Sequence, residues 1–583
     1  MQNRKTCIFE IAMGRLFQIQ IDKHQRSNRY FETGGTSSPI SNSCKIIYIS
    51  PSKALCQERY NDWAKRLKNI NPILECAMLT GDSSESYSSI QDVENAHLIL
   101  TTPEKWDLIT RKWTDNFFLI GSVKLILIDE VHFIGTVDRG ACLEAIICRM
   151  KTVQRAVKAH RNQLDSKGGD MSQKRSKEND LGPDASMRVV AVSATLPNVV
   201  DIANFLDAKK AYVFDSTYRP VPLTTHVVGL GYIGKNQFLF DKGLNRHVPD
   251  LINRFAKRRS TIIFCHTKKG TEVLATELIA SCGRNDPQLS QLAQNAKLES
   301  LKKCLIKGIA FHHAGMENDD RKLVEDYFSK GLIKHLCATS TLAMGVNLPA
   351  HLVIIKGTSV WRGAGQGYQE LDSGSLLQMM GRAGRPGFDK SGTAVIMTDT
   401  KSKPKYEQMS SGLEVVESML LNELTETLNI EISQRVITSV KEAVDWIKDT
   451  FFFIRVRKNP KQYGIKQKND SEIESYLMQS CMDAIQNLCR TKIINLYKEG
   501  NKIEPRKASH VMSRHMVPFQ GMEAIVVLPH DSGVLQILHC LSNMEGIQFP
   551  VRRSEKVKSR MLENEIIMSC IFMPKLEICF CTF

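Results

Sequence analysis

Two acidic residues, Asp129 and Glu130, follow four consecutive apolar residues in the segment LILIDEVHFIG. A buried strand that ends in such a pair places both carboxylates at the edge of a sheet. One of them can hold Mg²⁺ through water, and the other can orient or deprotonate an attacking water molecule. The simpler alternative is a helix N-terminus, where the helix dipole favours acidic side chains. The pair is a candidate site for metal-dependent hydrolysis.

Two arginines, Arg382 and Arg385, lie three residues apart in the segment QMMGRAGRPGFD. This spacing predicts that both side chains share one face of a helix, and the glycines allow another surface to approach closely. Such a pair can neutralise the charge that develops on a γ-phosphate during hydrolysis. A solvated basic helix is the simpler alternative. It does not account for Gln378, both arginines, the glycines and Pro386 occurring together.

Several further polar loops follow apolar runs and offer hydroxyl and backbone N–H groups that suit contacts with a sugar-phosphate backbone. They are SPSKALCQER with Pro51 and Lys53, LTGD with Thr80 and Gly81, TTPEKWD with Thr102 and Pro103, SATLPN with Ser193, Ala194 and Thr195, and ATSTLAMGVNLPA with Thr341, Gly345 and Asn347. Each of these loops by itself is more often an ordinary loop than a site. Their joint occurrence in this order indicates a single functional system.

The elements that position these loops are short apolar runs alternating with helical stretches. The runs are CKIIYIS, AHLILTT, VKLILIDE and MRVVAVSAT in the first part of the chain, and STIIFCH, GIAFHH, HLVIIKG and GTAVIMT in the second. This alternation predicts an α/β protein with two doubly wound parallel sheets. Ligands of such sheets bind beyond the carboxyl ends of the strands, where the polar loops occur.

Composition narrows the class of protein. The chain has 583 residues and a formal net charge of +16, which favours a polyanionic partner such as a nucleic acid over a merely basic surface. No apolar run reaches the length of a membrane span, and the first thirty residues lack a secretory leader pattern, so we expect an intracellular protein without a membrane partner. The sixteen cysteines form no CxxC pair, so no zinc site is indicated.

The ordered motifs resemble those of superfamily-two helicases of the DEVH-box, superkiller-like kind. They comprise SPSKALCQER, TGD, TTPEKWD, DEVH, SATLPN, FCHTKKG, HHAGM, ATSTLAMGVNLPA and QMMGRAGRPGFD, over about residues 1–400. TTPEKWDLITRKW and DEVHFIG look most like the meiotic DNA helicases of this family, which move 3′ to 5′. Spliceosomal and exosome relatives share nearly all of the motifs, so an RNA helicase remains an alternative.

The resemblance implies a domain organisation. It implies a RecA-like motor domain over residues 1–216, a second one over 217–412, a winged helix over 413–510 and an incomplete helical domain with a divergent tail over 511–583. A polar segment at about 151–187, with little apolar content, is expected to be a disordered insertion in the first motor domain. The segment YRPVPL is expected to be an extended linker, because proline fixes its own φ and restrains its predecessor.

The resemblance also implies a role for each candidate residue, with ATP and Mg²⁺ as cofactors. Lys5 and Thr6 would contact the phosphates, Thr6 and Asp129 the metal, and Glu130 the attacking water. The catalytic set would be completed by Gln378, Arg382 and Arg385, and Gly345 and Asp389 would also contact the nucleotide. The strand would be held by Pro51, Lys53, Thr80, Gly81, Thr102, Pro103, His312 and Thr341. Coupling between the two ligands would fall to His132, Ser193, Ala194 and Thr195.

One departure from the family pattern concerns the phosphate-binding loop. Lys5-Thr6 occupy the family's Lys-Thr positions, but Arg4 stands where the last glycine belongs. A bulky side chain there hinders the approach of phosphate to the backbone, so nucleotide affinity should suffer. We therefore expect a form of the motor shortened at both ends, and a nucleic-acid- or partner-binding fragment without hydrolysis remains an alternative. For the parent motor, the resemblance implies a monomer in the nucleus that acts on single-stranded or branched DNA with meiotic recombination proteins.

Overall fold

The computed structural model describes most of the chain, with gaps. The described residues are 2–28, 44–70, 74–80, 93–137, 139–166, 187–193, 196–214, 216–231, 236–284, 287–340, 342–343, 348–361, 367–410, 415–466, 469–497, 502–529, 531–542 and 544. They form two compact units. The first comprises Met1–Trp106, Phe118–Leu143 and Gln154–Ser418, and the second comprises Asp107–Phe117, Glu144–Val153 and Met419–Phe583.

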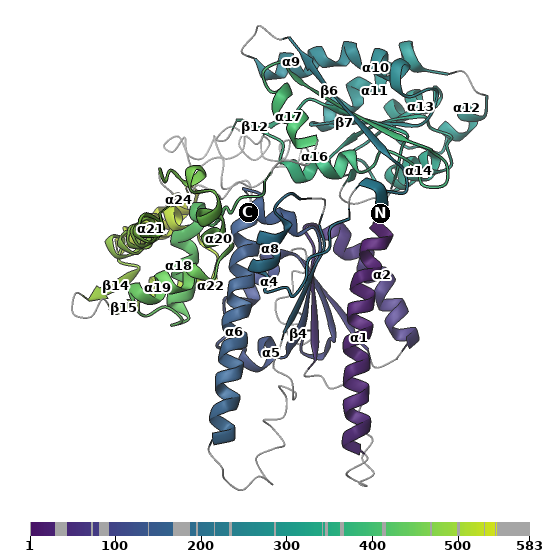
Figure 1. Cartoon of the computed structure of the whole chain (residues 1–583). Coiled ribbons are helices and arrows are strands. Elements are labelled where there is room, and N and C mark those ends of the chain that lie inside the picture. Colours follow the sequence, from purple (N-terminus) through teal and green to yellow (C-terminus); the bar gives the residue numbers. More distant parts are fainter. Residues whose placement is uncertain are drawn as a thin grey trace. The chain divides into compact units, whose positions relative to one another are not determined.

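The first sheet of the larger unit is parallel and has the strand order β2-β3-β1-β4-β5 (Figure 1). Its strands are β1 (Lys45–Ile49), β2 (Cys76–Leu79), β3 (Leu98–Thr101), β4 (Val123–Ile128) and β5 (Arg188–Ala191). The helices associated with this sheet are α1 (Gln2–Asn28), α2 (Lys53–Ile70), α4 (Pro103–Thr110), α5 (Phe117–Gly121), α6 (Gly140–Ser166) and α8 (Val199–Phe205). Ile49 pairs with both Thr101 and Ile128, so the loops after β3, β1 and β4 leave the same edge.

The helix α1 is fixed to this sheet by an apolar face. Phe9 packs edge-to-face against Tyr48 of β1, and Tyr48 packs in the same way against Trp63 of α2. The Glu10 carboxylate accepts hydrogen bonds from the Trp63 indole and the Arg66 guanidinium. These contacts place the first turns of α1 beside the carboxyl end of β1.

The second sheet of the larger unit has the order β6-β13-β10-β7-β9-β8, and all its pairings are parallel. Its strands are β6 (Leu223–Leu230), β7 (Thr261–Cys265), β8 (Ile309–His312), β9 (His335–Thr339), β10 (Leu352–Lys356) and β13 (Gly392–Asp399). Its helices are α9 (Gln237–Leu244), α10 (Val248–Phe255), α11 (Lys268–Cys282), α12 (Pro287–Ala293), α13 (Glu299–Leu305), α14 (Asn318–Ser329), α16 (Ser373–Met380) and α17 (Lys403–Ser410). A short hairpin, β11 (Ser359–Trp361) with β12 (Tyr368–Glu370), follows β10.

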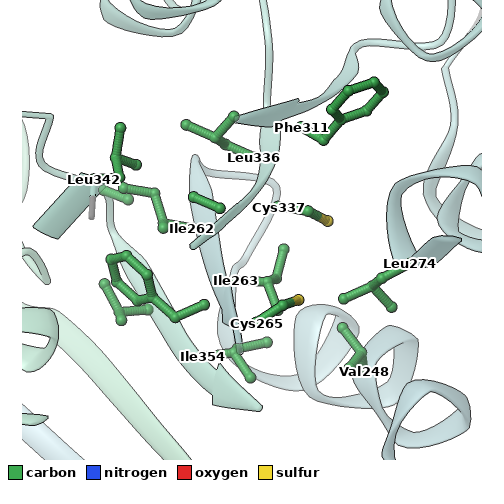
Figure 2. Close-up of a cluster of buried hydrophobic side chains, with 14 of the residues drawn as sticks. Val248, Ile262, Ile263, Cys265, Leu274, Phe311, Leu336, Cys337, Leu342 and Ile354 are labelled. Atoms are coloured by element: carbon green, nitrogen blue, oxygen red, sulfur yellow. The ribbon is translucent and has the colours of Figure 1, made fainter. Parts of the chain in front are cut away.

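Both faces of the strands β7, β8, β9 and β10 are buried, as continuous apolar runs predict. Figure 2 shows the alternation along β7, where Ile263 and Cys265 lie near Val248 of α10 and Leu274 of α11, and Ile262 points to the other face. All five of these side chains are buried. The predicted pair of doubly wound sheets is therefore confirmed.

The smaller unit contains the helical region after the second sheet. Its elements are α18 (Leu424–Ser433), α19 (Val440–Lys448), α20 (Phe451–Lys458), α21 (Asp470–Arg490), β14 (Ile494–Tyr497), β15 (Lys502–Pro505), α22 (Lys507–Arg514), α23 (Phe519–Val526) and α24 (Val534–Ser542). The antiparallel pair β14–β15 follows the four helices α18 to α21, and helices followed by a β-hairpin are the arrangement of a winged helix. The expected divergent tail lies largely outside the described residues.

One predicted segment needs correction. Most of the polar stretch at about 151–187 was expected to be a disordered insertion, but its first part is helical, because α6 continues as far as Ser166. The apolar residues Val153 and Val157 are fully buried and continue the helical periodicity of the preceding segment, which the polar composition of the stretch obscures. Residues 167–186 lie outside the described part of the chain. The exact domain limits remain predictions. Among the described helices, none has the length and apolar character to cross a membrane.

Candidate nucleotide and nucleic-acid site

Asp129 follows β4 and is held from two sides. Its backbone N–H donates to the Ile49 carbonyl at 2.9 Å, and its Oδ2 accepts a hydrogen bond of 2.8 Å from the Tyr48 hydroxyl. Burial and the neighbouring Asp129 charge raise the pKa of Tyr48, so the hydroxyl remains a donor. The tyrosine therefore fixes the orientation of the carboxylate at the edge of the sheet, which the sequence did not predict.

Glu130 has a left-handed backbone conformation, with φ of 53° and ψ of 52°. This conformation is uncommon outside glycine and asparagine, and residues with such strain concentrate at functional sites. The Glu130 Oε2 lies 3.4 Å from His132 Nδ1, and the same nitrogen lies 3.1 Å from the Ser193 hydroxyl. The structure thus brings together Glu130, His132 and Ser193, while Ala194 and Thr195 lie outside the described residues.

The two arginines have different surroundings. Arg382 is buried and donates from Nη2 to the Ala343 carbonyl, whereas the side chain of Arg385 is 28% exposed and pairs with Asp389. Burial lowers the pKa of Arg382, and the carboxylates of Glu58 and Glu130 partly offset this shift. Arg382 therefore lies in the electrostatic field of Glu130, one member of the acid pair, within the larger unit.

The expected helix face for these arginines is wrong. The helix α16 ends at Met380, and the following segment turns at Gly384 and Gly387, where φ is +92° and +83°. Glycine supplies these conformations without a steric penalty, and the intervening proline cannot continue the helix. A Cβ atom at Gly384 would lie 2.6 Å from Val221, so the turn also packs tightly.

Two other residues of the QMMGRAGRPGFD segment have buried polar atoms. The Gln378 Oε1 is buried without a hydrogen-bond partner among the described residues. An unsatisfied buried amide oxygen beside the arginines suits a ligand that donates a hydrogen bond, such as a water molecule bound with a nucleotide. The Asp389 carboxylate is fully buried and accepts hydrogen bonds from Arg385. Gly345, the other residue expected to contact the nucleotide, is outside the described part.

Lys5 and Thr6 lie inside the first turns of α1, which begins at Gln2. Thr6 is buried, whereas the side chains of residues 2–5 lie outside the described part of the structure. The Thr6 hydroxyl and the Asp129 carboxylate are both oxygen ligands of the type that Mg²⁺ prefers. The residues present therefore fit a magnesium-bound nucleotide, with the contribution of Lys5 remaining a prediction.

The predicted nucleic-acid residues follow strands of the two sheets. Pro51, Thr80 and Thr102 follow the neighbouring strands β1, β2 and β3, and Lys53 and Pro103 begin α2 and α4. Thr80 and Thr102 are buried, and Lys53 is exposed. His312 ends β8, where it is buried and its Nε2 lies 2.9 Å from the Glu325 carboxylate. Gly81, Thr341 and Asn347 lie outside the described residues.

An exposed aromatic pair on the hairpin was not predicted. The side chains of Trp361 on β11 and Tyr368 on β12 pack edge-to-face with ring centroids 5.1 Å apart, and they are 50% and 39% exposed. Exposed aromatic rings can stack on nucleic-acid bases. Their hairpin carries too few apolar residues for its pattern to be recognised in the sequence.

A buried charge network in the smaller unit was also not predicted. Arg149 of α6 lies 2.7 Å from Asp107 and 2.9 Å from Glu431 of α18, and Arg111 lies 2.6 Å from Asp107. Burial would raise the pKa of Asp107, but the two arginines hold it below its usual range. Burial raises the pKa of Glu431, since the single Arg149 contact compensates only in part. Asp107 closes the TTPEKWD segment, so one end of α4 belongs to this network.

Profiles of three known families match the chain. They are the DEAD/DEAH box helicase over residues 5–202, the Helicase conserved C-terminal domain over residues 244–387 and the Winged Helix-turn-helix domain over residues 417–498. Together with the two parallel sheets, these matches show that the chain carries a DEAD/DEAH box helicase domain, a helicase C-terminal domain and a winged helix-turn-helix domain.

Several individual proteins are similar to the chain over most of its length. The chain is 35% identical over 570 residues to the ATP-dependent DNA helicase homolog MER3 of Arabidopsis thaliana, covering 95% of this chain and 47% of the relative. It is 39% identical over 533 residues to the human Probable ATP-dependent DNA helicase HFM1, covering 89% and 35%. The Schizosaccharomyces pombe Pre-mRNA-splicing factor brr2 is 32% identical over 568 residues, covering 94% and 24%. The chain therefore spans less than half the length of each relative.

Proposed function

We propose that this chain carries the motor of an ATP-dependent DNA helicase that moves 3′ to 5′ and acts in meiotic recombination in the nucleus. The observation that carries this proposal is the acid pair at the end of β4, with Asp129 held by Tyr48 and Glu130 in the electrostatic field of Arg382. The DNA helicases MER3 and HFM1 are the relatives that support a DNA substrate.

The residues divide the work of the motor as follows. Bound MgATP supplies the phosphoryl group whose transfer to water releases free energy. Asp129 and Thr6 would hold the metal, Glu130 would take a proton from the attacking water, and the two arginines would balance negative charge on the phosphates. The buried Gln378 Oε1 would accept a hydrogen bond from a water molecule and orient it. The loops at Pro51, Thr80 and Thr102 hold one strand by its backbone, and His132 with Ser193 relays changes at Glu130 to these loops.

The first experiment measures ATP hydrolysis with and without single-stranded DNA. The unaltered chain is expected to hydrolyse ATP faster with DNA, and Glu130→Gln is expected to lower the rate by roughly 100-fold, the usual contribution of a general base. The matched control is Glu407→Gln, on the exposed face of α17, which should leave the rate unchanged. Full activity in the Glu130→Gln chain would remove Glu130 from this role.

A second candidate is a nucleic-acid- or partner-binding fragment that does not hydrolyse ATP. The observation that favours it is Arg4, which precedes Lys5 at a position where the phosphate loop requires glycine. Arg4→Gly should then create an ATPase activity that the unaltered chain lacks, while single-stranded DNA binding is the same in both. Equal hydrolysis before and after the substitution would favour the motor.

A third candidate is an RNA helicase, which the likeness to the splicing factor brr2 favours. Competition separates the two substrates. Unlabelled DNA and RNA of one sequence are added to the chain bound to labelled single-stranded DNA, and the DNA proposal requires that DNA competes at the lower concentration. Stronger competition by RNA would reverse the assignment.

A further inference from the structure

The Asp389 carboxylate accepts three hydrogen bonds from Arg385. Its Oδ2 accepts hydrogen bonds from the backbone N–H of Arg385 at 3.0 Å and from Nε of the same residue at 2.9 Å, and its Oδ1 lies 3.2 Å from Nη2. The Asp389 side chain is fully buried. A carboxylate with this geometry binds the Nε and Nη2 edge of the guanidinium group and fixes the plane of that group.

The opposite edge of the same guanidinium remains available. The Arg385 Nη1 forms no hydrogen bond within the part of the chain that the structure describes, and the side chain is 28% exposed. A guanidinium group has five N–H donors in a planar fork, of which Asp389 engages the Nε and Nη2 side. The free Nη1 edge is thus presented in a fixed direction to an incoming oxyanion.

Three neighbours support this arrangement. Arg259 Nη1 and His351 Nδ1 lie 3.4 Å and 3.5 Å from Asp389 Oδ1, so the carboxylate has further cationic or polar neighbours if Arg385 moves. The Phe388 ring, which is 82% exposed, lies 5.6 Å from the Arg385 guanidinium carbon and limits its swing on the solvent side. Burial would raise the pKa of Asp389, but its bonds to Arg385 keep that pKa low, so the carboxylate is charged.

We propose that Asp389 is a positioning residue that orients Arg385 toward the γ-phosphate, and that Asp389 makes no contact with the nucleotide itself. This inference rests on the proposed function for its target, because the oxyanion is taken to be the terminal phosphate. It replaces the expectation that Asp389 binds the nucleotide. The inference also distinguishes how the two arginines are held. Arg382 donates to a backbone carbonyl, whereas Arg385 pairs with a side-chain carboxylate.

The first test is chemical modification and requires no nucleotide. Phenylglyoxal modifies arginine side chains, and mass spectrometry of the peptide that contains residues 382 and 385 gives the rate at each position. Asp389→Asn removes the charge at constant shape, so modification of Arg385 should become about 5-fold faster. Modification of Arg382, which donates to a carbonyl, should not change.

The matched control is Asp399→Asn. Asp399 ends β13 in the same sheet and accepts hydrogen bonds from the backbone of Lys401 and Ser402, and no arginine among the described residues pairs with it. Substitution of Asp399 should leave the modification rates of both Arg382 and Arg385 unchanged. If Asp389→Asn unfolds the domain by circular dichroism, Asp389→Glu keeps the charge and takes its place. Protection of Arg385 in that folded variant supports the proposal, and reactivity equal to that of denatured protein overturns it.

The second test is a double-substitution cycle on nucleotide selectivity. The ratio of affinities for a non-hydrolysable ATP analogue and for ADP is measured in Arg385→Ala, in Asp389→Asn and in the double variant. If Asp389 acts through Arg385, each single variant lowers the ratio and the double variant lowers it no further. Additive losses would overturn the proposal by giving Asp389 its own contact. If even the unaltered chain binds no nucleotide, the proposed function fails, and the modification rates still decide whether Asp389 positions Arg385.

Discussion

At the scale of single residues, Tyr48 determines how firmly Asp129 is held. Tyr48→Phe removes the 2.8 Å hydrogen bond and leaves the ring in place. Because hydrogen bonds to charged groups are among the stronger ones, the free energy of unfolding should fall by about 1–2 kcal/mol in urea denaturation. Tyr60→Phe, at a half-buried position of α2, is the control and should change stability by less than about 0.5 kcal/mol. Equal effects of the two substitutions would contradict a special role for the Tyr48 hydroxyl.

His335, the first residue of β9, gives a prediction on pH. Burial, followed by the charges of Lys334 and Arg284, lowers the pKa of His335 from 6.5 to about 4. The unfolded chain therefore takes up a proton on this residue before the folded chain does. The contribution of neutral His335 to the free energy of unfolding is complete above pH 6.5. It is lost as the pH falls from 6.5 toward 4, by an amount on the order of 3 kcal/mol.

The measurement is the free energy of unfolding as a function of pH. His335→Leu should weaken the decline between pH 6.5 and 4, while His515→Leu, at an exposed position, should not. An unchanged slope in the His335→Leu chain would show that other groups cause the acid sensitivity.

At the scale of elements, the charge network around Arg149 joins α4, α6 and α18 within the smaller unit. Arg149→Met would leave Asp107 and Glu431 buried with less compensation, so unfolding of this unit should become easier by about 3–5 kcal/mol. Glu431→Gln should lower the free energy of unfolding by only roughly 1–2 kcal/mol, because burial already disfavours the charged form of this side chain.

Chemical denaturation monitored by the tryptophans of the smaller unit would measure both effects. The control is Arg155→Met at an exposed position of α6, which should have little effect on stability. A smaller loss for Arg149→Met than for Glu431→Gln would show that the arginine is not the centre of the network.

The elements also show what the sequence could and could not reveal. Eight of the strands could be predicted, because buried parallel strands are continuous apolar runs that end in polar residues. The strands β2, β6 and β9 were missed, since their runs contain threonine, histidine and cysteine. The helix to Ser166 was hidden by its polar composition, although its buried positions keep a helical period.

The sequence suggests which residue types form the candidate site, but not the side chains that support them. Asp129, Glu130 and the arginines stand in local motifs that the sequence displays directly. Tyr48 lies 81 residues from its partner Asp129, and Arg149 lies 282 residues from Glu431, so no local pattern relates them. The backbone turn at Gly384 was also missed, because a spacing of three residues between arginines fits a helix as well as a turn.

At the scale of the whole molecule, the net charge of +16 predicts salt-sensitive binding to nucleic acid. Binding to a single strand releases counterions, so the logarithm of affinity should fall linearly with the logarithm of salt concentration. If about four phosphates are contacted, affinity should fall roughly 50-fold between about 50 and 200 mM salt. Fluorescence anisotropy with labelled single-stranded DNA measures the slope.

Removal of one lysine charge at a time tests this prediction further. Lys53→Gln, at the exposed start of α2, should lower the slope by about 0.7 if this lysine meets one phosphate. Lys458→Gln, at the end of α20 in the smaller unit, is the matched surface change. Affinity that does not depend on salt would mean that the basic charge serves another partner.

The left-handed backbone at Glu130 has a practical consequence for work on inactive forms. An asparagine adopts this conformation with little penalty, whereas glutamine retains the conformational cost, so Glu130→Asn should melt later than Glu130→Gln although both lack the acid. A difference of about 1 kcal/mol would make the asparagine variant the better choice for trapping DNA complexes. It would also show that glutamate at this position carries a backbone conformational cost that asparagine avoids.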